Sequence, residues 1–202
     1  MNYYIADTHF GHSNILRFDN RPFSDVQDME QTIIKNWNER VTKDDTVYIL
    51  GDFCWGLENE WIRILDQLNG MKVLIRGNHD LKSPSANLKK KFCKITDYDE
   101  IKDNGKRIIM SHYPILFYRA SYNPDVWHFC GHTHNRTDEE FRRQVFVLDL
   151  VYDSTTQSKD YLNKGHIVNV GCMMPYVNYT PRTADELIVW WNDYYINKKA
   201  EI

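Results

Sequence analysis

Residues 73–80 have the sequence VLIRGNHD, in which a short apolar run ends abruptly in polar residues. The apolar part predicts a buried strand, and the polar part then lies at the carboxyl end of that strand. The same arrangement occurs over residues 46–52, TVYILGD, where a β-branched and apolar run stops at Gly-Asp. This repeated pattern of a strand followed by polar residues decides the fold class.

Three further segments on either side of these two follow the same pattern. Each has an apolar run that leads into His or Asp: NYYIADTH (2–9), IIMSH (108–112) and VWHFCGHTH (126–134). Residues 145–151 and 167–170 predict additional strands. In alternating β/α proteins, the carboxyl ends of parallel strands share one edge of the sheet, where ligands bind. We therefore expect the polar residues of all five segments to converge on one site.

Helices are predicted between the early strands and near the end of the chain. Apolar residues at i, i+4 spacing over 29–41 predict one amphipathic helix, and 61–68 predict a second, which ends at Asn69-Gly70. Thr183 followed by Glu186 predicts a capping box at the start of a last helix. The early half alternates strand and helix, whereas the later half is mostly strands. The pattern predicts an α/β protein with two packed sheets and helices outside.

The composition indicates an ordinary globular protein. The 202 residues contain no linker or repeat, so we predict a single domain over residues 1–202. A net charge of -3 gives no support to a nucleic-acid-binding surface. The four cysteines have no CxxC spacing and are expected to be reduced. No apolar run approaches the ~20 residues of a membrane span, and the N-terminus does not resemble a secretory signal. We expect a cytoplasmic protein with no membrane partner.

Histidine is the unusual residue, because most of the 8 histidines have Asp, Asn or Gly as close neighbours. The strand ends offer a set of imidazole, carboxylate and amide groups that suits divalent metals: Asp7, His9, Asp52, Asn78, His112, His132 and His134. Mixed nitrogen and oxygen ligands favour Mn, Fe, Zn, Ni or Co over calcium. The set is too large for one tetrahedral zinc but suffices for two ions that share a carboxylate, ~3.5–4 Å apart.

Two other features of these segments support the metal hypothesis. Gly51, Gly77 and Gly131 each directly precede a candidate ligand, and the absence of a Cβ lets the backbone approach an ion closely. Two divalent ions also carry more positive charge than the two carboxylates in the set can neutralise. The site would therefore attract an anion, and phosphate is the natural candidate.

The motifs D-x-H, G-D, G-N-H-D, H and G-H-T-H occur in the order found in calcineurin-like metallophosphoesterases, which this chain resembles from Asp7 to about Leu187. The resemblance implies a four-layer α/β/β/α sandwich with two mixed sheets flanked by helices. It implies hydrolysis of a phosphomonoester or phosphodiester by a metal-bridging hydroxide. It also implies a bridging Asp52, with the other ligands divided between one metal (Asp7, His9 and His134) and a second (Asn78, His112 and His132).

The resemblance implies roles for residues that are not ligands. His79 would face the substrate, where it donates to the phosphate or protonates the departing oxygen, and Asp80 could orient the His79 ring. Arg76 resembles the phosphate-contacting arginine of the R-G-N-H-D/E motif in phosphoprotein phosphatases, and a surface salt bridge is the alternative. From the residues alone, His12 either reaches the leaving group or the phosphate of a substrate, or it caps the helix that follows it or hydrogen-bonds a backbone carbonyl.

The expected function is that of an enzyme with a small phosphorylated or nucleotide substrate, because about 200 residues leave little room for a specificity domain. Two alternatives are a catalytically silent metal-binding interaction module and a nuclease. The retained His79 argues against the first, and the net charge gives no support to the second. No oligomeric state is predicted. Aromatic and Met residues in two loops either shape a substrate pocket or simply pack: Tyr113, Phe117, Tyr118, Tyr122, Met173, Met174, Tyr176 and Tyr179.

Overall fold

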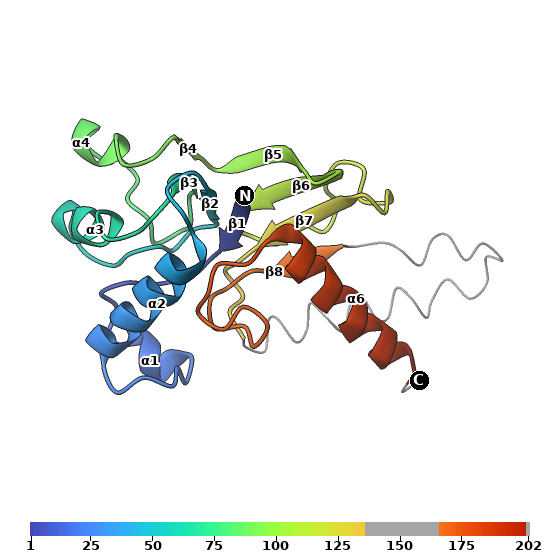
Figure 1. Cartoon of the computed structure of the whole chain (residues 1–202), viewed down its shortest axis with the longest axis horizontal. Helices are drawn as coiled ribbons and strands as arrows, with labels where there is room; N and C mark the ends of the chain where they lie inside the picture. Colours follow the sequence, from blue (N-terminus) through green and yellow to red (C-terminus); the bar gives the residue numbers. More distant parts are fainter. Residues whose placement is uncertain (136–165, 201–202) are drawn as a thin grey trace.

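The computed structural model describes residues 1–135 and 166–200, which form two four-stranded sheets and flanking helices (Figure 1). The first sheet has the order β1-β2-β3-β4 and the second has the order β5-β6-β7-β8. Among the described residues, no helix has the length and apolarity of a membrane span.

The first sheet is entirely parallel in its described strands: β1 (Asn2–Ile5), β2 (Thr46–Ile49), β3 (Met71–Ile75) and β4 (Lys94–Thr96). Its central residues are apolar on both faces, as expected for a sheet that is covered on both sides. Ile5 aligns with Ile49, and Ile49 aligns with Leu74. This register brings the residues that follow β1, β2 and β3 to the same edge.

The second sheet is mixed. It contains β5 (Tyr98–Asp103), β6 (Lys106–Ser111), β7 (Val126–Cys130) and β8 (Ile167–Asn169). Strand β5 is antiparallel to β6, whereas β6, β7 and β8 are parallel to one another. All five residues of β7 are buried. The segments that follow β6 and β7 supply His112, His132 and His134, whereas His128 lies within β7 and His166 directly precedes β8.

The helices lie outside the sheets. Figure 1 shows α2 (Val26–Arg40), α3 (Glu58–Leu65) and α4 (Ala86–Lys89) beside the first sheet and α6 (Ala184–Ala200) beside the second. The Asp25 carboxylate caps α2 by accepting the Asp28 N–H. Helix α6 contacts β1 and β8. A short helix, α1 (Ile15–Phe18), lies next to the segment that follows β1.

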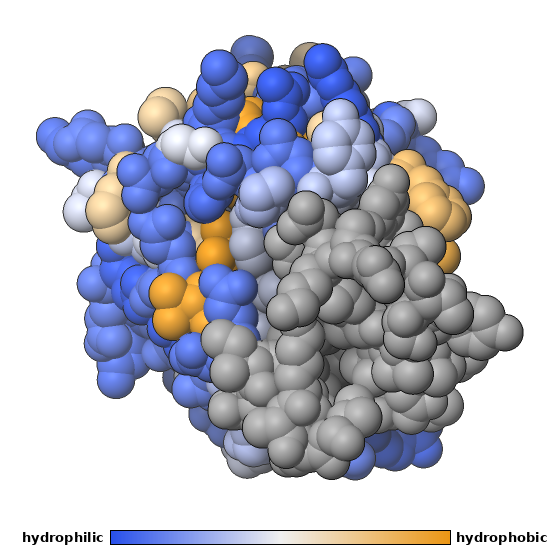
Figure 2. All heavy atoms as spheres, turned by 90° about the vertical axis from the view of Figure 1, so that its right-hand side faces the viewer, coloured by the Kyte–Doolittle hydropathy of each residue, from blue (hydrophilic) through white to orange (hydrophobic). Residues whose placement is uncertain are grey.

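One hydrophobic cluster extends through both sheets and the helices that cover them. Tyr4 of β1 packs edge-on against Phe129 of β7, with 4.9 Å between the ring centroids. Trp37 of α2 and Trp61 of α3 are almost completely buried. Among the described residues visible in Figure 2, hydrophilic side chains dominate and hydrophobic ones form small, separate groups. The apolar side chains are thus concentrated between the layers.

The predicted α/β fold with two sheets flanked by helices is confirmed, and the capping box at Thr183 and Glu186 is present. The Thr183 N–H donates to Glu186 Oε2 at 2.9 Å, and the Glu186 N–H donates to Thr183 Oγ1 at 3.4 Å. Helix α3 ends at Leu65, earlier than predicted, and only hydrogen-bonded turns lead on toward Asn69. The strand predicted over 145–151 lies outside the described residues.

Strands β4 and β5 were not predicted from the sequence. The β5 segment, YDEIKD, is mostly charged and shows no apolar alternation, because β5 is an edge strand with only β6 beside it. Its side chains are mostly half-buried, and its pairing partner β6 supplies the apolar residues instead. Periodicity reports burial, so a strand of this kind gives no periodic signal.

Candidate metal centre

Four side chains from three strand ends converge at the edge where the two sheets meet. Asp7 and His9 follow β1, Asp52 follows β2 and His134 follows β7. Each offers one ligand atom, and these atoms all lie within 4.8 Å of one another. Three of the four residues are buried and His134 is half-buried. Both sheets therefore contribute to a single cluster of carboxylates and imidazoles.

The backbone of the ligand segments has an uncommon conformation. Asp7, His9, Asp52 and His134 have positive φ values of 54°, 50°, 50° and 51°. Residues with a Cβ rarely adopt this left-handed region, and each such residue costs of order 1–3 kcal/mol. The Asp7 N–H donates to the Gly51 carbonyl and the His9 N–H donates to the Asp52 carbonyl, both at 3.0 Å. These bonds hold the strained turns in place.

His9 has a free ring nitrogen that suits a cation. Among the described residues, His9 Nε2 is buried and has no hydrogen-bond partner. Burial, followed by the charge of Arg21, lowers the pKa of His9 to about 2. The ring is therefore neutral at pH 7, and its unshared nitrogen lies 3.7 Å from Asp52 Oδ2. A divalent metal would satisfy both a buried orphan nitrogen and a buried carboxylate.

A second group lies on the other side of Asp52. His112 Nε2 is 3.5 Å from Asp52 Oδ2 and 3.0 Å from Asn78 Oδ1, and the rings of His112 and His132 are 5.1 Å apart. His112 Nδ1 lies 2.8 Å from the Leu50 carbonyl, which can only accept, so Nδ1 carries the proton. Burial lowers the pKa of His112, but the hydrogen bond to Asp52 and the nearby carboxylates outweigh it and raise the pKa to about 9, so without a metal Nε2 is protonated as well. A metal at Nε2 would displace that proton. Asp52 Oδ2 thus faces a histidine from each group.

Gly77 and Gly131 lie against the two carboxylates. A Cβ on Gly77 would be 2.3 Å from Asp52 Oδ1, and a Cβ on Gly131 would be 2.5 Å from Asp7 Oδ2. Both separations are far shorter than a van der Waals contact. The sequence predicted that these glycines let the backbone approach an ion, and the structure shows a close approach to the carboxylates of two candidate ligands.

We expect Gly77→Ala to destabilise the metal-free protein by about 1–3 kcal/mol, because the added methyl group overlaps Asp52. It should also reduce metal content, because Asp52 must move. Chemical denaturation and elemental analysis measure the two effects. Gly105→Ala is the control for metal content, since no atom lies within 4 Å of its Cβ position and only its φ of +80° strains an alanine there. Full metal content in Gly77→Ala, as in Gly105→Ala, would show that the overlap at Gly77 does not disturb Asp52.

Asp19 and Arg21 support the centre, and sequence reasoning missed both. Asp19 accepts a hydrogen bond from His134 Nδ1 at 2.8 Å, and this leaves His134 Nε2 facing Asp7 Oδ1 at 3.7 Å. Arg21 pairs with Asp19 at 2.9 Å and donates to the Asp7 carbonyl at 2.8 Å. A carboxylate behind a metal-binding histidine fixes its tautomer and orientation. The segment around Asp19 carries no motif, so no sequence signal indicated this role.

An Asp19→Asn variant is expected to bind metal about 10–100-fold more weakly, because an amide no longer enforces the orientation and basicity of His134. Competition with a chromophoric chelator measures the affinity. Asp66→Asn is the control, because Asp66 is exposed and forms an ion pair only with Lys91 among the described residues. Unchanged affinity in Asp19→Asn would mean that Asp19 does not act through His134.

The model of the calcineurin-like phosphoesterase superfamily domain matches residues 3–183 of this chain. The chain belongs to this superfamily. An uncharacterized protein of Methanocaldococcus jannaschii is 40% identical over 140 residues, which are 68% of this chain and 72% of that protein. The gene 66 protein of Mycobacterium phage L5 is 38% identical over 81 residues, 39% of each chain. The crystal structure of a protein of unknown function from Aquifex aeolicus has a TM-score of 0.65 and 28% identity, and the match covers 94% of this chain and 98% of that one.

His79 and Asp80 differ in their placement in this calcineurin-like domain. His79 is exposed, and its backbone N–H donates to Asp52 Oδ1 at 2.9 Å. The Asp80 carboxylate is buried and accepts N–H groups of Asp52, Phe53 and Gly77 at 2.8–3.0 Å. The expected contact of Asp80 with the His79 ring is replaced by these backbone bonds, because buried N–H groups of two loops require an acceptor. Asp80 therefore joins the loops that carry Asp52 and Asn78.

His12 lies in the same pocket as the ligand candidates. This pocket has a volume of about 390 Å³ and is lined by ligand residues, His12, Trp55 and His79. The His12 ring stacks on Trp55 with 4.3 Å between centroids. His12 therefore lies beside the candidate ligands, and its contact with a substrate remains a prediction.

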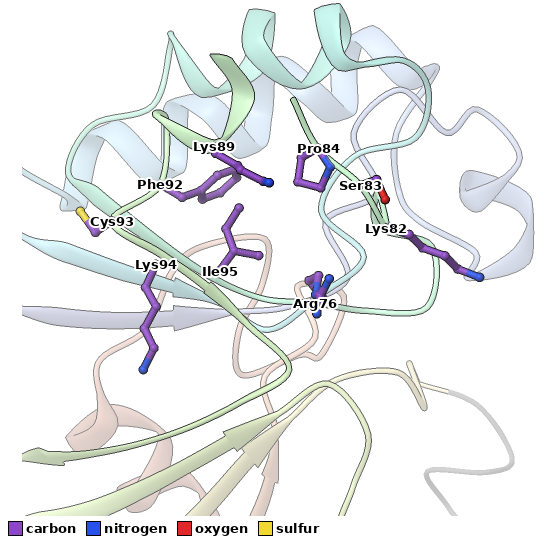
Figure 3. Close-up of a pocket in the computed structure, with 9 residues that line it drawn as sticks. All are labelled: Arg76, Lys82, Ser83, Pro84, Lys89, Phe92, Cys93, Lys94 and Ile95. Carbon is purple, nitrogen blue, oxygen red and sulfur yellow. The ribbon is translucent and has the colours of Figure 1, made fainter. Parts of the chain in front are cut away.

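Arg76 lies outside that pocket. Its guanidinium forms two hydrogen bonds of 2.8 Å with the Asp97 carboxylate. Arg76 lines a separate pocket of about 480 Å³ with Lys82, Lys89 and Phe92 (Figure 3). The salt-bridge alternative is the one observed, and the phosphate contact of Arg76 stays a prediction. The Arg76 N–H donates to the Thr96 carbonyl at 2.8 Å, so Arg76 continues the pairing with β4 and lies beside Asp97.

The remaining candidates divide between packing and exposed positions. Met173, Met174, Tyr118 and Tyr179 are buried in the hydrophobic clusters, and none of the four lines the pocket beside the candidate ligands. Tyr113 is half exposed and lies against His132, with 4.4 Å between ring centroids. Phe18 and Trp55, which the sequence did not single out, line the pocket instead.

Proposed function

We propose that the chain hydrolyses a phosphomonoester or phosphodiester of a small molecule with the help of two divalent metal ions. The observation that carries this proposal is the position of Asp52 Oδ2, 3.7 Å from His9 Nε2 and 3.5 Å from His112 Nε2. One carboxylate is thereby shared by two groups of ligand atoms. Asp7, His9 and His134 would hold one ion with Asp52, and Asn78, His112 and His132 would hold the other.

The charges of the ligand set favour an anionic substrate. Asp7 and Asp52 supply two negative charges, and the remaining ligands are neutral imidazoles and an amide. The loaded centre therefore keeps a positive charge that attracts phosphate. When bound, two divalent ions supply a nucleophile at neutral pH and neutralise the charge that develops on the phosphoryl group. We propose Mn as the metal, with Fe, Zn, Ni or Co able to replace it.

His79 is proposed as the group that donates a proton to the departing oxygen. It is exposed in the pocket, and its ring lies 5.9 Å from the His9 ring and 5.3 Å from the Trp55 ring. The hydrogen bond from its backbone to Asp52 fixes its distance from the proposed bridge. Proton donation by a positioned side chain contributes typically ~10²–10⁴-fold to a rate.

The proposal is tested on protein purified with Mn and assayed with p-nitrophenyl phosphate, bis-p-nitrophenyl phosphate and a nucleotide panel. We expect hydrolysis of at least one class and about two metal ions per chain by plasma emission analysis. Preference for the diester would indicate a phosphodiesterase. Inactivity on every substrate with full metal content would favour a metal-binding interaction module, and a metal content near one would contradict the two-ion arrangement.

A further inference from the structure

The pocket beside the metal-ligand cluster has two chemically different walls. One wall consists of the ligand candidates and His79, and the other consists of Ile15, Phe18, Trp55 and the His12 ring. The volume of about 390 Å³ lies within the ~300–1,000 Å³ typical of small-molecule sites. The pocket is therefore large enough for a substrate that extends well beyond its phosphate group.

The second wall contains a continuous row of rings, which we call the aromatic wall: Phe18, His12 and Trp55. The His12 ring lies face to face with Trp55 at 4.3 Å and edge-on to Phe18 at 6.2 Å. Trp55 is 44% exposed and Phe18 is 48% exposed, although most other large aromatic residues of the first sheet and its helices are buried. Partly exposed rings at the edge of a polar pocket offer stacking area to a planar ligand.

The backbone holds Trp55 in place. The Trp55 N–H donates to the Phe10 carbonyl at 2.7 Å, and Phe10 and Cys54 form a β-bridge. A Cβ on Gly11 would lie 2.9 Å from the Trp55 carbonyl oxygen, so the two segments approach as closely as glycine allows. The aromatic wall is thus formed by two segments that are hydrogen-bonded to each other. A surface that is already ordered loses little entropy when a ligand binds.

The aromatic wall is on the leaving-group side of the proposed reaction. Trp55 lies beside His79, with 5.3 Å between their ring centroids. If His79 protonates the departing oxygen, the group attached to that oxygen must extend past His79 and over Trp55. His12 covers one face of Trp55, so a ligand would stack on the part of this ring that remains exposed. A nucleobase has a planar face that suits such stacking, whereas an aliphatic alcohol has none.

We propose that the aromatic wall binds the base of a nucleoside that forms the leaving group, so that the preferred substrate is a nucleotide. This inference rests on the proposed phosphoesterase function. It adds Phe18, His12 and Trp55 as residues that determine the substrate. Stacking of one base on an aromatic side chain is worth ~5–150-fold in affinity.

Two measurements test the inference on the Mn-loaded protein. Calorimetry compares the binding of adenosine with that of ribose, and neither ligand requires turnover. Competition against p-nitrophenyl substrates compares the inhibition constants of adenosine 5′-monophosphate, phenyl phosphate and ribose 5-phosphate. We expect adenosine and its monophosphate to bind at least ~10-fold more tightly than their ribose counterparts. Tighter binding of phenyl phosphate than of the nucleotide would overturn the assignment to a nucleobase.

The variants separate stacking from general damage. Trp55→Ala should weaken the binding of adenosine and its monophosphate ~10-fold and leave that of ribose 5-phosphate unchanged, while Trp55→Phe should retain most of the affinity. Phe117→Ala is the control, because Phe117 is an exposed aromatic residue that does not line this pocket. Equal binding of adenosine and ribose in an active enzyme would refute the aromatic wall and leave the phosphoesterase proposal intact. Tight adenosine binding without any hydrolysis would support the aromatic wall and contradict the phosphoesterase proposal.

Discussion

An Asp52→Asn variant is expected to lose phosphoesterase activity and at least one of the two metal ions. The Asp52 carboxylate is almost completely buried, and its Oδ2 faces both His9 and His112. An amide has no charge to neutralise two cations and offers only one oxygen. The loss should exceed the ~10–100-fold reduction that is typical when a residue that only supports a ligand is changed.

Metal content and thermal unfolding measure this effect independently of turnover. Binding of an ion to the folded state alone stabilises that state by mass action, so added Mn should raise the melting temperature of the unmodified protein. We expect a much smaller rise for Asp52→Asn and an unchanged rise for the control Asp66→Asn. Two ions per chain in an inactive Asp52→Asn protein would show that the carboxylate is not needed to hold the metals.

A His79→Ala variant is expected to retain both metals but to lose ~10²–10⁴-fold in kcat on substrates with a poor leaving group. The His79 side chain belongs to neither ligand group, and its backbone bond to Asp52 does not depend on the side chain. The loss should be largest for alkyl phosphoesters, whose leaving oxygen needs a proton, and small for p-nitrophenyl esters.

The dependence on leaving group distinguishes the two roles open to His79. If the ring only contacts the phosphoryl oxygens, the loss in kcat should be similar for alkyl and p-nitrophenyl esters. His79→Gln is the matched variant, because glutamine keeps a hydrogen-bond donor but cannot transfer a proton at neutral pH. Loss of metal from His79→Ala would instead place the ring among the ligands.

The candidate ligands could be predicted from the sequence because each lies within a few residues of the end of an apolar run. Covalent adjacency places Asp7, Asp52 and Asn78 at the ends of β1, β2 and β3, and parallel pairing then brings these ends to one edge. His112 and His132 follow β6 and β7 in the same way. The edge strand β5 gave no such signal, because its charged residues show no periodicity.

Side-chain partners that depend on the packing of distant segments could not be predicted from the sequence. The carboxylate of Asp19 accepts a hydrogen bond from His134, which lies 115 positions further along the sequence, and Arg76 pairs with Asp97 outside the pocket of the candidate ligands. Asp80 was expected to contact its neighbour His79, but its carboxylate instead accepts hydrogen bonds from backbone N–H groups of two loops.

The sequence by itself therefore determined the fold class and the identity of the residues at the strand ends, because both follow from local patterns of burial and adjacency. Only the tertiary structure decided which residues support the candidate ligands and which rings line the pocket beside them. Those features depend on distances of a few ångströms between loops. Such distances are set by the packing of the whole core and cannot be predicted from the residues of any single segment.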